Sequence, residues 1–257
     1  MNKVLFRFLI FILVVMAIIS AIREVNWFKL FQIEEVSLDL EKKIGDEIWN
    51  SMKITEPIDS SVARIEFVNS VKNKICLSNH FDTASIKVHL VNRDIINAFA
   101  MPGGHLVVYT GLFKKCKSAE QLAGIMGHEI AHIQEKHVTK KLIKEVGLSV
   151  LVAITGGNVE GVKAVIEHLS SVAYDRKLEK EADLKSIEYL DAANINPVGL
   201  AEFMEELDKM DGELPEELGW FSTHPESKER AKYIRKKVNS INKKYPPLNS
   251  NWDSFKN

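Results

Sequence analysis

The chain of 257 residues is poor in cysteine, with only Cys76 and Cys116, which are widely separated. This count excludes a disulfide-rich scaffold, and the absence of a CxxC pair excludes the usual redox and zinc-ribbon motifs. We expect two buried thiols rather than a disulfide. The sequence also lacks an excess of charge of either sign, with 34 Lys and Arg against 35 Asp and Glu. Without a basic surplus, nucleic acid is not an expected partner.

Disordered and fibrous classes are excluded by the composition, because 46% hydrophobic and 27% charged residues are ordinary for a globular protein. Most of the chain reads as one domain, which we place at residues 34–240. The segment 241–257, with its Tyr-Pro-Pro sequence, is expected to be a loose C-terminal tail.

One long apolar run begins the chain. From Val4 to Ile22 the only charged residue is Arg7. A membrane-spanning helix needs about 20 apolar residues, whereas the apolar part of a signal peptide has about 7 to 15. We therefore expect residues 1–22 to be an N-terminal transmembrane anchor that contacts the membrane through residues 4–22. A cleaved signal is the alternative, and a juxtamembrane linker follows at residues 23–33.

The few charges flanking the apolar run favour an N-terminus inside the cell. This orientation places the domain in the periplasm of a bacterium, anchored to the inner membrane. A cleaved signal would instead leave a periplasmic or secreted protein.

Hydrophobic periodicity predicts an α+β fold with a mostly helical body and a small sheet. Helical spacing covers residues 34–78 with a break at Pro57, and a single helix is expected over residues 159–192. Alternation over residues 86–90 predicts a strand. The Pro-Gly-Gly turn at residues 102–104 predicts a hairpin between its two flanking β-rich segments.

The clearest chemical motif is the sequence HEIAH at residues 128–132, on a helix that a Ser118–Gln121 capping box begins. His128 and His132 are four residues apart, so both rings lie on one helical face and can bind one zinc ion. Glu129 is placed to contact a water molecule beside the metal. It would serve as the general base of a zinc hydrolase.

A catalytic zinc needs a third protein ligand. The HExxHxxGxxH pattern would supply it at residue 138, which is Val138 here, so the ligand comes from elsewhere. Glu179 and Asp183 share one face of a later helix. Glu179 is the preferred ligand, because Asp183 one turn along can then accept the N–H of a zinc-bound histidine. Glu181 is the alternative ligand.

Four motifs, in this order, resemble the HtpX/BepA/Oma-type zinc metallopeptidases, which form metallopeptidase family forty-eight among the gluzincins: NAFAMPGG, HEIAH, EKEAD and THPESKER. The resemblance implies a zincin-like fold with an edge strand beside the HExxH helix. It implies one zinc ion per chain, bound by His128, His132 and Glu179, with Glu129 as base and Asp183 behind the ligands. The expected substrates are misfolded or unassembled membrane or envelope proteins.

The same resemblance gives His224 a role as a fourth zinc ligand that closes the site and moves away to open it. Two alternatives remain open. His224 or Arg230 could donate to the oxyanion during turnover, or the Thr-His-Pro sequence could merely cap the last helix, with Pro225 at its first position.

The segment from Asn97 to Gly104 is the second functional candidate. An extended substrate can pair with an edge strand here through backbone hydrogen bonds. Ala98 and Phe99 would line this substrate, while Gly103 and Gly104 would form the turn. A plain hairpin accounts for the segment equally well. The other five histidines have no expected role in chemistry: His80, His89, His105, His137 and His168.

These features together predict a membrane-anchored zinc endopeptidase. The alternative is a zinc-stabilised factor that binds client proteins for quality control or assembly and rarely cleaves them, with a site closed by His224. A weaker third possibility is a zinc hydrolase that acts on small amides.

Overall fold

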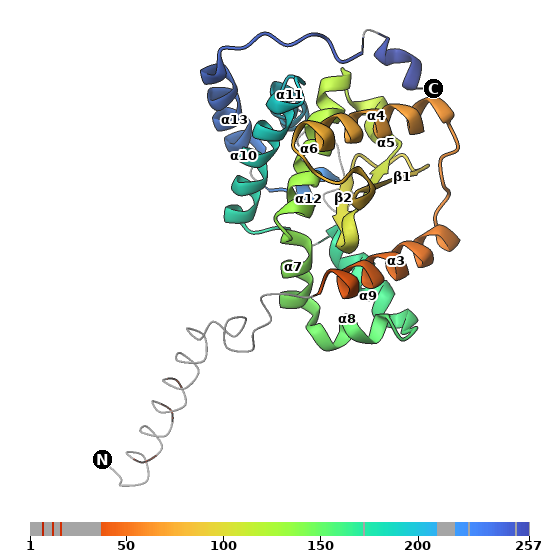
Figure 1. Ribbon diagram of the computed structural model, residues 1–257. Coiled ribbons are helices and arrows are strands. Elements are labelled where there is room, and N and C mark those ends of the chain that lie inside the picture. The colour runs from red at the N-terminus through yellow and green to blue at the C-terminus, as the bar shows by residue number, and fades with distance from the viewer. Residues whose placement is uncertain are drawn as a thin grey trace. The chain divides into compact units, whose positions relative to one another are not determined.

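The computed structural model describes residues 37–171, 173–209, 219–225, 227–249 and 251–256, together with the single positions 7, 12 and 16 (Figure 1). The predicted anchor at 1–22 and linker at 23–33 lie outside these ranges. Among the helices of the described part, none is both long and apolar enough to cross a bilayer. Residues 39–257 form one unit by their internal contacts.

The described part is mostly helical with one small sheet, so the predicted α+β class is confirmed. The strands are β1 (Lys87–Val91), β2 (Ala98–Met101) and β3 (His105–Tyr109). The helices before and just after the sheet are α3 (Leu38–Thr55), α4 (Val62–Ser78) and α5 (Gly111–Lys115). The following helices are α6 (Ala119–Gln134), α7 (His137–Val146), α8 (Leu148–Ile154), α9 (Val159–Ser171), α10 (Arg176–Ala192), α11 (Val198–Asp208), α12 (Trp220–Thr223) and α13 (Ser227–Ile241).

The sheet has the strand order β1-β3-β2. β3 runs antiparallel to β2, with Ala98 opposite Val108, which confirms the predicted hairpin. β3 also runs parallel to β1, with Lys87 opposite His105. The later half of the hairpin is thus the middle strand, and β2 lies at the edge.

Two hydrophobic cores cover the two faces of the sheet. Leu106 and Val108 belong to a core that includes residues of α4, α6, α10, α11 and α13. Val107 and Tyr109 belong to a second core that includes residues of α3, α7, α8 and α9. In Figure 1, α4 lies on one side of the sheet, and α3, α8 and α9 lie on the other. Because both faces are covered, all five residues of β3 are buried.

The hairpin turn depends on its glycines. Gly103 and Gly104 have φ angles of 70° and 79°, a region that residues with a side chain rarely adopt. A Cβ atom on Gly104 would lie 1.8 Å from the backbone oxygen of Ser85. The turn therefore packs too tightly for any side chain at this position.

The predicted single helix over residues 159–192 is two helices, α9 and α10. The Asp175 side chain accepts a hydrogen bond from the Leu178 N–H, so Asp175 caps a new helix instead of continuing the first. The break brings Tyr174 into the interior, where it is 6% exposed.

The segment expected to be a loose tail packs against the domain near its end. Trp252 is 5% exposed, and its indole N–H donates to the backbone oxygen of Cys116 at 2.7 Å. Its ring also stacks on Phe113. Cys76 and Cys116 themselves are buried free thiols, as expected.

Candidate metal centre

The helix α6 begins as its sequence predicts. The Ser118 side chain accepts a hydrogen bond from the Gln121 N–H. The Gln121 side chain accepts from the N–H of Lys117 rather than from that of Ser118. This variant of the capping box still satisfies two backbone donors at the helix start. The cap fixes the first turn of the helix that carries His128 and His132, whose side chains are fully buried.

Four buried side chains meet at one point: His128, His132, Glu179 and His224, each offering one ligand atom within 4.8 Å of the others. They come from α6, from the first turn of α10 and from the residue after α12. The structure thus brings the two histidines of HEIAH together with Glu179 and His224. Glu181 is 44% exposed at its side chain and lies outside this cluster.

The spacing of these donor atoms fits a zinc ion. His128 Nε2 lies 3.0 Å from His132 Nε2 and 3.2 Å from His224 Nδ1. Glu179 Oε1 lies 3.3 Å from His132 Nε2 and 2.9 Å from His224 Nδ1. Ligand atoms around tetrahedral zinc, with bonds of about 2.0–2.1 Å, are about 3.3 Å apart. Three imidazoles and one carboxylate are also a donor set that zinc accepts.

The electrostatics of the centre favour a positive charge there. Burial raises the pKa of Glu179, but the charges of His224 and Arg230 outweigh burial and hold it well below its usual value. Burial lowers the pKa of His132 to about 3, so its ring is neutral and keeps a lone pair. Burial also opposes a charge on His224, yet Glu179 and Glu129 raise its pKa to about 9. The two carboxylates thus favour a positive charge at this position, which either a protonated imidazole or a metal ion would supply.

Glu129 lies beside the cluster, and its two carboxylate oxygens face different groups. Its Oε2 accepts a hydrogen bond from the Ala100 N–H of β2 at 2.9 Å. Its Oε1 lies 3.3 Å from His224 Nε2. Burial raises the pKa of Glu129, but His224, His132 and His128 together lower it by more, so the side chain is an ionised carboxylate.

Asp183 lies behind His128, at 3.0 Å between its Oδ1 and the His128 Nδ1. The Arg230 guanidinium donates to both oxygens of Asp183 at 2.8 and 2.7 Å. The same guanidinium contacts Glu179, and the Tyr233 hydroxyl contacts Asp183. Despite burial, Arg230 lowers the pKa of Asp183 to about 2. Arg230 is thus engaged by two carboxylates, which favours its structural role over contact with an oxyanion.

His132 has a partner on the side of its ring that faces away from the cluster, and this partner was not predicted from the sequence. His137, the first residue of α7, lies with its Nδ1 3.1 Å from the His132 Nδ1 and is 1% exposed. On its other side, His137 Nε2 lies 3.5 Å from Glu181 Oε2. Burial lowers the pKa of His137 below its usual value.

Two aromatic rings cover the metal-facing histidines. Tyr174 stacks on His132 with ring centroids 4.0 Å apart, and Trp220 stacks on His224 at the same separation. The backbone N–H of Tyr174 also donates to the Thr223 oxygen. These contacts hold the residue after α12 against the site. No sequence pattern pointed to Tyr174, because its position depends on the break before α10.

The segment that carries His224 also pairs with Ile96, just before the segment proposed for substrate. Gly219 pairs in parallel with Ile96, and the Trp220 N–H donates to the Ile96 oxygen at 3.0 Å. The side chains of Ala98 and Phe99 are buried, at 0% and 3% exposed. Any contact of a substrate with these two residues would therefore be made by backbone atoms and not by the side chains.

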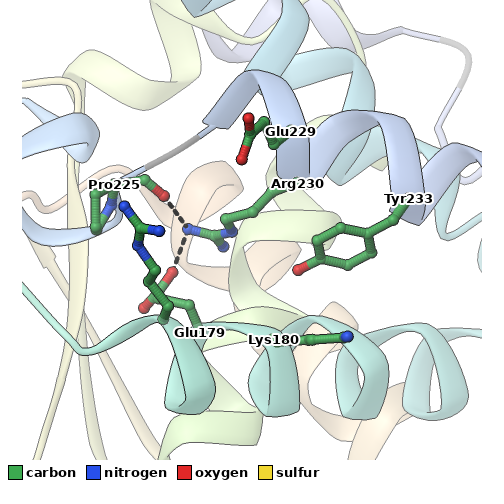
Figure 2. Close-up of a pocket in the computed structure, with 7 residues that line it drawn as sticks. Glu179, Lys180, Pro225, Glu229, Arg230 and Tyr233 are labelled. Atoms are coloured by element: carbon green, nitrogen blue, oxygen red, sulfur yellow. Dashed lines mark hydrogen bonds and ion pairs between the residues drawn. The ribbon is translucent and has the colours of Figure 1, made fainter.

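An open pocket of about 190 Å³ borders the centre on its α10 and α13 side. In Figure 2, Arg230 points between the Pro225 oxygen and Glu179, and the Tyr233 ring lies beyond it. Arg176, Lys180 and Glu229 complete the lining. Glu179 thus belongs both to the lining of this pocket and to the four-donor cluster.

Comparison with known proteins identifies the family. The sequence profile described as "Peptidase family M48" matches residues 66–238, which include all four candidate ligands. The chain belongs to this family. Family M48 comprises zinc metalloproteases, so the predicted resemblance and enzyme class are confirmed.

Several curated proteins are similar to this member of family M48. Mitochondrial metalloendopeptidase OMA1 of Schizosaccharomyces pombe is 25% identical over 79% of this chain and 62% of its own length. The beta-barrel assembly-enhancing protease of Escherichia coli is 26% identical over 80% of this chain and 45% of its own length. Metalloprotease LoiP of Escherichia coli is 30% identical over 64% of this chain and 67% of its own length. The chain thus spans less than two thirds of the first two relatives.

Proposed function

We propose that this M48 protein is a membrane-anchored zinc endopeptidase that hydrolyses misfolded or unassembled membrane or envelope proteins. The observation that carries the proposal is the buried cluster of His128, His132, Glu179 and His224 with the ionised Glu129 beside it. A zinc ion held there would supply Lewis acidity and lower the pKa of a water molecule.

In this proposal Glu129 is the base that accepts the proton of the attacking water and passes it to the leaving amine. The Ala100 N–H holds one of its oxygens and so directs the other toward the cluster. Asp183, held by Arg230, orients His128. His128, His132 and Glu179 are the three protein ligands that a catalytic zinc site requires.

His224 keeps the site closed in this proposal. With four protein ligands a zinc site resembles a structural one and has no position for water. The other ring nitrogen of His224 lies 3.3 Å from the Glu129 carboxylate, so the closed arrangement also occupies the base. Opening requires the segment 219–224 to leave Ile96 and Tyr174.

The proposed substrate mode is pairing with the β2 edge. Extended chains add to an edge strand through backbone hydrogen bonds, which demand little of the substrate's sequence. That property suits unfolded or unassembled proteins. Departure of the segment 219–224 would free the Ile96 oxygen, two residues before β2, so opening the metal centre would also free one backbone acceptor for an extended chain. The names of the relatives, mitochondrial or linked to β-barrel assembly, support an envelope role.

The test is cleavage of an unfolded protein such as casein by the full zinc-loaded chain. Glu129→Gln should keep zinc, because Glu129 is not in the four-donor cluster, and should lower cleavage at least about 100-fold as a lost general base. His224→Ala should raise cleavage above wild type. Loss of zinc from Glu129→Gln, or unchanged cleavage by it, would contradict the assigned base.

The second candidate function is a client-binding factor for quality control or assembly, favoured by the observation that His224 lies within the four-donor cluster. Its signature is client binding that survives Glu129→Gln, without gain of cleavage in His224→Ala. Zinc binding without casein cleavage in either wild type or His224→Ala would support this second function.

A further inference from the structure

The two histidines of HEIAH have different outer partners. His128 faces the carboxylate of Asp183, which Arg230 and Tyr233 hold in place. Among the described residues, no such clamped carboxylate lies behind His132. Its Nδ1 instead faces the Nδ1 of His137 at 3.1 Å, in a position where both rings are almost fully buried.

The proton positions in this pair follow from the metal-facing atom. When His132 offers a lone pair on Nε2 to the cluster, its only N–H is on Nδ1. That N–H needs an acceptor, and the facing Nδ1 of His137, 3.1 Å away, supplies one. The N–H of His137 is then on Nε2, which faces Glu181 at 3.5 Å. The N–H groups therefore all point in one direction: that of His132 toward His137, and that of His137 toward Glu181.

We propose that His137 is a positioning residue, which fixes the His132 tautomer and ring orientation that the metal requires. This inference rests on the proposed zinc site. Outer partners of metal-binding histidines set the tautomer and the ring direction, and losing one costs about 10- to 100-fold in metal affinity. Glu181 is the last residue in this series of contacts, and its side chain is half-exposed. A water molecule can therefore replace it at small cost.

The experiment measures the zinc affinity of the full chain by competition with a chromophoric chelator. His137→Leu removes the acceptor while keeping an apolar volume, and it should weaken zinc binding 10- to 100-fold. His137→Asn places an amide oxygen near the position of Nδ1, so it should recover most of the affinity. Glu181→Ala should stay within about threefold of wild type.

His105→Leu is the matched control. His105 is also 1% exposed and hydrogen-bonds to a second histidine, His89, but it lies outside the four-donor cluster. Circular dichroism checks that each variant folds, and His137→Ala replaces His137→Leu if the latter does not fold.

Equal zinc affinity of wild type and His137→Leu would overturn the inference alone. So would an equal loss in His105→Leu, or a His137→Asn variant as weak as His137→Leu, because packing rather than the acceptor would then matter. A wild-type chain that binds no zinc would overturn the proposed function, and with it this inference.

Discussion

At the scale of single residues, Glu179 and Glu181 are close in sequence but differ in surroundings. Glu179 is 1% exposed and lies among the donor atoms, whereas the Glu181 side chain is 44% exposed. We expect Glu179→Ala to weaken zinc binding at least about 100-fold, because it removes a ligand and leaves Arg230 short of a carboxylate. Glu181→Ala is the matched control. Chelator competition measures both, and the reverse order of effects would move the ligand to Glu181.

The sequence predicted those site residues that lie one helical turn apart on the same helix. His128, Glu129 and His132 needed only the i, i+4 spacing, and Glu179 and Asp183 needed it once more. It did not indicate a role for His137, because continued helical periodicity would turn that residue away.

The chain in fact leaves the helix after Gln134. Lys136 takes a left-handed conformation with φ 56°, and this turn returns His137 to His132. A non-glycine residue at positive φ has no reliable sequence signal, so the contact could not be predicted.

At the scale of elements, the crossing of α6 and α11 depends on two glycines. A Cβ atom on Gly199 would lie 2.1 Å from the Glu120 oxygen, and one on Gly124 would lie 2.5 Å from the Leu200 nitrogen. The helices therefore approach backbone to backbone. This contact fixes the direction of the helix that carries both histidines.

We expect Gly199→Ala to lower the free energy of unfolding by at least about 1–3 kcal/mol, because the helices must separate to admit the methyl group. Thermal melting measures the effect. Gly156→Ala serves as control, since its Cβ would lie 3.4 Å from the Ala153 oxygen, near ordinary contact. Equal melting temperatures for Gly199→Ala and Gly156→Ala would contradict this prediction, because α6 and α11 could then accommodate a methyl group at their crossing.

Local sequence patterns predicted helices and strands, but not which of them lie next to each other. Alternation over residues 86–90 predicted β1, and the Pro-Gly-Gly turn with its β-rich flanks predicted the β2–β3 hairpin. The parallel pairing of β1 with β3 joins segments separated by the whole of β2, and no local pattern specifies it. The cap at Asp175 was present in the sequence, yet the apolar spacing on both sides of it predicted one continuous helix.

At the scale of the whole molecule, residues 39–257 hold all four donors and form a unit by their own contacts. Deleting residues 1–22 should therefore move the protein from the membrane pellet to the supernatant while its zinc affinity stays within about threefold of the full chain. Ultracentrifugation and chelator competition measure the two effects. The full-length Glu129→Gln variant should remain in the pellet. A truncated chain that still sediments with membranes would place another contact in the remaining residues.

Burial of the metal centre has a kinetic consequence. All four donors are at most 1% exposed, and Tyr174 and Trp220 cover two of them. A chelator could reach the metal only after the segment 219–224 separates from Ile96. At high chelator concentration the rate of metal loss would then reach a ceiling equal to the rate of that separation. The rate of metal loss would thus measure how fast the segment 219–224 opens, without any substrate present.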